Sequence, residues 1–176
     1  HMGGAAAILA NFRPRELCLD DPADPEMEAL LQQAQQLGVR VVSRRAGDEF
    51  DFGGAEVRIL ASGAQDLAAR RNDESLVMKL VYGKTSALLE GDAEKRSEQQ
   101  IAEEQPEADL LKVAHHGSAT STSPLLLDRV HPRFAVISVG ALNTYGHPGG
   151  EVLPRRETAH VMTSSTDPDA PPPSSL

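Results

Sequence analysis

Residues that could bind a metal ion or transfer protons follow three apolar segments of the chain. Each segment is followed within a few residues by a carboxylate or an imidazole: Asp92 after 87–89, His115 and His116 after 110–114, and His147 after 134–139. Polar residues at strand ends are where rigid scaffolds place functional loops. A set of one carboxylate and several imidazoles is typical of sites for Zn, Mn or Fe, and it differs from a site built on thiolates. We therefore expect these residues to converge at one edge of a sheet.

Each of these segments also has a purely structural explanation. Asp92 could cap a following helix, His116 could belong to a turn, and His147 could be an ordinary loop residue. Adjacent residues at a strand end point to opposite faces. Only one of His115 and His116 is therefore expected to reach a given metal.

Composition limits the classes of protein to which this chain can belong. Its 176 residues carry a formal charge of −9, with 40% hydrophobic and 24% charged residues, which is typical of one globular domain. Aromatic residues make up only 3% and Trp is absent, which argues against a stacking platform for single-stranded nucleic acid. The acidic balance argues against binding DNA mainly by bulk charge.

Several sequence features indicate a soluble piece without disulfides. Cys18 is the single cysteine, so no internal disulfide can form. The longest uncharged stretch, 134–150, is too short and too interrupted to span a bilayer, so no membrane insertion is expected. The apolar stretch near the N-terminus lacks a basic leading region and is not a convincing signal peptide.

The elements that must position the polar segments are predicted from periodicity and turn residues to alternate along the chain. Helices are expected at 5–12, 25–37, 93–105 and 122–130. Strands are expected at 16–19, 39–42, 50–52, 56–60, 75–82, 85–89, 109–114 and 134–139, with hairpins at Gly53-Gly54 and Gly83-Lys84. The pattern predicts an α/β (α+β) domain over 1–160 and a disordered Pro/Ser tail over 161–176.

Four joined motifs then match a known series in order and spacing: 72–77, 88–92 with Glu98 downstream, 109–118, and 137–148. Together they resemble the C-terminal metallo-β-lactamase-like domain of the ComEC family of DNA-uptake channel proteins. The resemblance implies an αββα sandwich with a hydrolase site for one or two divalent ions, Zn or Mn.

The resemblance also implies roles for individual residues. Asp92 resembles the bridging metal carboxylate, and one of His115 and His116 resembles the late metal histidine. His147 resembles the last histidine of the site, as a ligand or a substrate contact. Asp92, His116 and His147 are the expected catalytic residues. Substrate contacts are expected from six polar residues around the motifs: Asn72, Ser75, Lys112, Ser118, Asn143 and Tyr145.

The sequence departs from the family pattern at its front. The leading metal motif should precede Gly3-Gly4, and only His1 and Met2 stand there, so the sandwich is expected to be N-terminally truncated. His1 is either the last residue of that motif, and then a metal ligand, or part of a cloning scar. No histidine lies between His1 and His115, which points to a single metal, a preference for Mn, or a degenerate site.

Two classes of function follow. The first is a metal-dependent phosphodiesterase or nuclease domain for DNA uptake, tethered through its parent to a membrane channel domain and exposed outside the cytoplasm. The second is a catalytically incomplete fragment that serves as a structural or docking module. A freestanding hydrolase of small esters or phosphodiesters and a homodimer both stay open. A Ser-His hydrolase and an NTPase are disfavoured because neither a Gly-x-Ser-x-Gly elbow nor a phosphate-binding loop is present.

Overall fold

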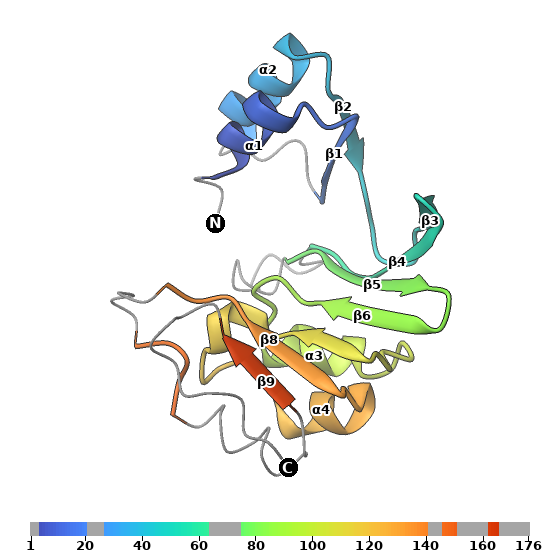
Figure 1. The fold of residues 1–176 in the computed structure, drawn as a ribbon, viewed down its shortest axis with the longest axis vertical. Helices are drawn as coiled ribbons and strands as arrows, with labels where there is room; N and C mark the ends of the chain where they lie inside the picture. Colours follow the sequence, from blue (N-terminus) through green and yellow to red (C-terminus); the bar gives the residue numbers. More distant parts are fainter. Residues whose placement is uncertain (1–3, 21–26, 64–74, 141–145, 151–161, 166–176) are drawn as a thin grey trace. The chain divides into compact units, whose positions relative to one another are not determined.

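The computed structural model describes residues 4–20, 27–63, 75–140, 146–150 and 162–165 (Figure 1). Contacts between residues group the chain into two compact units, 1–45 and 46–176.

The first unit is built from two helices and a two-stranded parallel sheet. Its elements are α1 (Ala5–Phe12), β1 (Glu16–Leu19), α2 (Glu28–Gln36) and β2 (Arg40–Ser43), with β1 paired to β2. The predicted bounds of α1 and β1 are confirmed. Apolar residues at helical spacing on α1 and α2 bury Leu9, Leu30 and Ala34 in a small shared core with Val39.

The second unit is a seven-stranded mixed sheet in the order β3-β4-β5-β6-β7-β8-β9 (Figure 1). Its strands are β3 (Glu49–Phe52), β4 (Ala55–Ala61), β5 (Val77–Tyr82), β6 (Thr85–Leu89), β7 (Leu110–Lys112), β8 (Phe134–Ile137) and β9 (Met162–Ser165). Strands β3 to β6 pair antiparallel, and β6 to β9 pair parallel. Both glycine-directed hairpins are confirmed, and so is the mixed α/β class.

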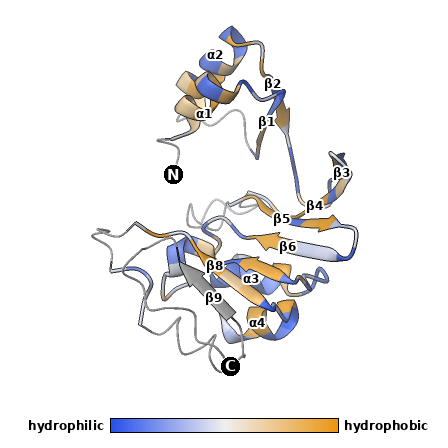
Figure 2. Ribbon diagram, in the orientation of Figure 1, coloured by the Kyte–Doolittle hydropathy of each residue, from blue (hydrophilic) through white to orange (hydrophobic). Residues whose placement is uncertain are grey.

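Helices α3 (Lys95–Ile101) and α4 (Pro124–Val130) share one buried core with the strands of this sheet. Leu88 and Leu111 occupy one cross-strand row, and their side chains are fully buried in that core. Figure 2 shows the apolar residues along β5 and the adjoining strands. Ser123 caps α4, because its hydroxyl accepts a hydrogen bond from the amide of Leu126 at 3.3 Å.

Predicted and observed elements differ at several bounds, and three differences change how the sheet and its edge are built. β7 ends at Lys112, and 114–117 form a 3₁₀ turn where a strand was expected to run on to residue 114. α3 spans seven residues of the thirteen predicted, because the polar residues after Ile101 bury nothing. β9 lies within the segment predicted to be disordered, and pairing with β8 makes it a strand. Within the described part of the chain, no helix has the length and apolar character needed to cross a membrane.

Candidate metal centre

The three predicted polar segments do meet at one edge of the larger sheet. Strands β6, β7 and β8 are mutually parallel, so their carboxyl ends lie together. His116 Nε2 lies 4.0 Å from Asp92 Oδ1. The ring of His115 lies 5.6 Å from that of His147, centre to centre. One carboxylate and three imidazoles therefore gather where the sequence predicted.

Asp92 is positioned by the glycine before it and by Ser75. Gly91 has a φ of +58°, and a Cβ built on it would lie 3.1 Å from Ser75 Cβ, so this site needs glycine. The hydroxyl of Ser75 accepts a hydrogen bond from the Asp92 amide at 3.0 Å. The N-cap of α3 is Glu94, so Asp92 stands two residues before the helix cap.

His116 presents its Nε2 atom to Asp92. Its Nδ1 atom lies 2.6 Å from the carbonyl oxygen of Ser138, which can only accept, so Nδ1 donates and carries a proton. A neutral ring then leaves a lone pair on Nε2. This is the arrangement in which proteins hold metal-binding histidines.

The surroundings of His115 differ from those of His116. A difference was expected, but its cause is not the one predicted. Its Nδ1 atom is buried and lies 3.5 Å from Glu94 Oε1, with no hydrogen-bond partner among the described residues. The expectation that adjacent residues alternate between faces of a strand is wrong here, because both histidines lie in the 3₁₀ turn. Their φ angles are 45° and 54°, and the two rings lie edge-on with their centres 6.5 Å apart.

His147 is held against the histidine turn by backbone packing. The amide of Gly149 donates to the carbonyl oxygen of Gly117 at 2.8 Å. A Cβ on Gly117 would lie 2.8 Å from Pro148 Cβ, so only glycine permits this approach. Burial lowers the pKa of His147 below its usual 6.5, and the neighbouring histidines lower it further while Asp92 opposes them. His147 is therefore neutral at neutral pH.

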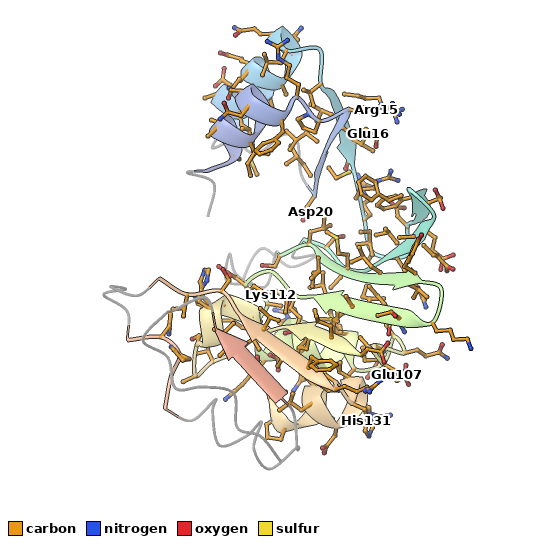
Figure 3. All side chains as sticks on the ribbon, viewed as in Figure 1. Arg15, Glu16, Asp20, Glu107, Lys112 and His131 are labelled. Carbon is orange, nitrogen blue, oxygen red and sulfur yellow. The ribbon has the colours of Figure 1, made fainter. Side chains whose placement is uncertain are left out.

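Two charged groups of the site region come from the strand ends. Lys112, the last residue of β7 (labelled in Figure 3), donates from Nζ to the carbonyl oxygen of Val113 at 2.8 Å. Burial lowers the pKa of Lys112, whereas the nearby charges of Asp92 and Glu90 raise it. Glu90 is fully buried, and burial followed by the charge of Glu98 raises its pKa well above the usual value.

The remaining predicted site residues fall into two groups. Ser118 is buried, and its hydroxyl lies 3.0 Å from Thr120 Oγ1, which donates in turn to Glu94 Oε1. The other group lies outside the described residues: His1, Asn72, Asn143 and Tyr145. Glu90 and Glu94 were not predicted as site residues, although each stands within two positions of Asp92.

The arrangement can be compared with what a metal ion requires. Within the described ranges, no three His, Cys, Asp or Glu side chains are grouped closely enough to hold an ion. Asp92 and His116 offer a carboxylate oxygen and an Nε2 lone pair, which suit Zn or Mn. The donors fit the implied metal in chemistry, and further ligands would be needed to complete its coordination.

Comparison with known proteins gives close sequence relatives. No family model matches the chain. It is 33% identical over 171 residues to ComE operon protein 3 of Bacillus subtilis, covering 95% of this chain and 22% of that protein. It is 34% identical over 157 residues to Recombination protein 2 of Haemophilus influenzae, covering 88% of this chain and 18% of that protein. The chain thus spans about a fifth of the length of these relatives.

The fold is similar to that of a solved structure. The metallo-β-lactamase fold protein YhfI of Bacillus subtilis superposes with a TM-score of 0.56 at 11% identity, covering 95% of this chain and 70% of that one. At this identity the likeness shows the fold alone. The chain has a metallo-β-lactamase fold.

Proposed function

Since this chain is a homologue, over one segment, of the ComEC family of competence proteins, we propose that it is a metal-dependent hydrolase domain acting on phosphodiester bonds of DNA during uptake. One observation carries the proposal. The Ser138 carbonyl oxygen engages His116 Nδ1 at 2.6 Å, which leaves Nε2, 4.0 Å from Asp92 Oδ1, as the ring nitrogen available to a metal ion.

The chain's own residues would divide the work as follows. Asp92 and His116 would hold a divalent ion, Zn or Mn, which when bound lowers the pKa of water and neutralises charge on a phosphoryl oxygen. His147, neutral at neutral pH, offers a third donor or a hydrogen-bonding contact to the substrate. The Lys112 ammonium lies near Asp92 and would attract the phosphate charge.

The parent protein would supply what this segment lacks. A net charge of −9 opposes strong binding of a polyanion by this segment alone. We expect the rest of the parent, including a membrane channel domain, to deliver the DNA and to hold this domain outside the cytoplasm.

A docking or structural module is the second candidate. It is favoured by the lack of a group of three metal-binding side chains within the described residues. The two candidates differ in whether the chain binds a divalent ion at Asp92 and His116.

Metal binding tests the proposal directly. Titration calorimetry with Zn²⁺ and Mn²⁺ should show stoichiometric binding by the wild-type chain and its loss in Asp92→Ala. His116→Ala should weaken binding at least tenfold, and His115→Ala should weaken it less, because only His116 faces Asp92. His131→Ala is the matched control, since His131 is exposed beyond the end of α4. Wild-type protein that binds no ion, or equal losses in the two site histidine variants, would refute the proposed site.

A further inference from the structure

The loop 114–123, which carries both site histidines, has an unusual backbone. His115, His116 and Thr122 have φ angles of 45°, 54° and 54°. L-residues rarely adopt this left-handed region, and it is least favourable for a β-branched residue such as threonine. Such a backbone persists only where the surrounding structure over-determines it.

Two fully buried carboxylates hold this loop at its two ends. Glu98 of α3 accepts hydrogen bonds from the amide of Thr122 on Oε1 and from the amide of Ser123 on Oε2, the second at 2.9 Å. Glu90, which follows β6, accepts from the amide of Ala114 on Oε2 at 3.2 Å. Each of these hydrogen bonds fixes backbone rather than a side chain.

Glu98 acts at the more strained of the two ends. It engages Thr122 itself, whose own hydroxyl is buried with no partner among the described residues. We call the hydrogen bonds that Glu98 and Ser121 make to the backbone of this loop the brace. The Ser121 hydroxyl lies 3.0 Å from the carbonyl oxygens of Ala114 and Ser118. The brace therefore runs from α3 through 121–123 to the start of the histidine turn.

We propose that Glu98 is a positioning residue of this site: its carboxylate binds the amides of Thr122 and Ser123, and this holds the loop in the left-handed conformation that turns His116 toward Asp92. Glu98 is not one of the proposed metal ligands or substrate contacts. The proposal rests on the proposed function only for its effect on metal binding. The backbone part stands on the loop alone.

The competing explanation is that Glu98 merely fills buried volume. Buried ionic groups can often be replaced by apolar residues of similar size at no cost in stability. Glu98→Met keeps the volume and removes both acceptors, whereas Glu98→Gln keeps one acceptor oxygen and turns an N–H group toward a backbone N–H. Ile101→Val is the control, because Ile101 is also fully buried on α3 and the change only shortens an apolar side chain.

The first measurement is amide hydrogen exchange of Thr122 and Ser123 by NMR on the full chain without metal. These two amides should be as protected as those of the α3 core in the wild type. They should exchange at least tenfold faster in Glu98→Gln and faster still in Glu98→Met, with Ile101→Val leaving them close to wild type. Fast exchange in the wild-type protein would overturn the proposal even if neither Glu98 variant folded.

The second measurement is the affinity for Zn²⁺ by calorimetry. Glu98→Gln should weaken binding about 10–100-fold, the usual effect of losing a group that orients a metal ligand. The Zn²⁺ affinity of Ile101→Val should stay within about twofold of wild type, even where its melting temperature falls as much as that of Glu98→Gln. Unchanged affinity in Glu98→Met, or an equal loss in Ile101→Val, would overturn the positioning role. Wild-type protein that binds no Zn²⁺ but shows the predicted exchange pattern would refute the proposed function. It would still support the role of Glu98 in holding the loop backbone.

Discussion

Replacing Gly117 with alanine tests the contact that brings His147 to the other histidines. The new Cβ would lie 2.8 Å from Pro148 Cβ and 3.3 Å from Pro148 Cα. Carbon atoms in contact are normally about 3.5–4.0 Å apart, so the loop 146–150 must move away by about 1 Å. That movement would break the hydrogen bond from the Gly149 amide to the Gly117 carbonyl.

The expected loss of stability combines three physical effects. Gly117 has a φ of +82°, where a side chain costs about 1–2 kcal/mol. Overpacking costs about 1–3 kcal/mol, and the lost hydrogen bond about 1 kcal/mol. If the loop moves away, the hydrogen bond is lost but the steric overlap is relieved, so the two costs do not add in full. We expect a decrease of about 2–4 kcal/mol in the free energy of unfolding.

The assay is urea denaturation followed by far-ultraviolet circular dichroism, because the chain contains no Trp. Gly83→Ala is the matched control: its φ is +61° and no atom lies within 4 Å of the new Cβ, so it measures the backbone cost alone. Equal losses for the two variants, with equal denaturant slopes, would show that the packing of Pro148 on Gly117 is not present.

Two further changes probe buried or bonded carboxylates, with opposite dependence on pH. Hydrogen bonds from the Ser86 amide and hydroxyl lower the pKa of Asp109 below its usual 3.8. The ionised Asp109 carboxylate stabilises the fold above about pH 4, and this stabilisation is lost as pH falls through its lowered pKa. Urea denaturation should therefore show that the difference in free energy of unfolding between wild type and Asp109→Asn becomes smaller in acid. Burial raises the pKa of Glu90 above its usual 4.5, so its ionisation costs stability as pH rises above that value. Glu90→Gln should therefore gain stability relative to wild type as pH rises from about 4.5, and a gap independent of pH would contradict this.

Local sequence signals predicted the elements whose cause is local. Gly53, Gly54 and Gly83 supply the positive φ angles that tight turns need, so both hairpins were predictable from turn residues. The position of the site was also predictable, since a carboxylate or imidazole after each of three apolar segments implies convergence once the strands are parallel. β9 was not predictable, because its Ser/Thr-rich sequence becomes a strand only by pairing with β8.

The residues that hold the histidine loop in place could not be recognised from the local sequence. Glu98 lies in a helix rich in charged residues, and sequence pattern alone places it among solvated side chains. Its burial follows from the packing of α3 against α4 and the sheet. The conformation of His115 and His116 was missed for the same reason, because a left-handed φ at a non-glycine residue depends on contacts distant in the sequence.

The electrostatics of the sheet edge bear on the proposed binding of a cation. Burial and the adjacent histidines keep His147 neutral, so its protonation does not supply positive charge to Asp92. His116 presents Nε2 to Asp92 at 4.0 Å, because its Nδ1 atom is engaged by the carbonyl oxygen of Ser138. Lys112 lies near enough to feel the Asp92 charge, yet its Nζ atom donates to a backbone carbonyl, and burial weakens its hold on the proton. The proposed function requires that a positive ion be bound by the Asp92 carboxylate and His116 Nε2 together, so metal affinity is the property on which it depends.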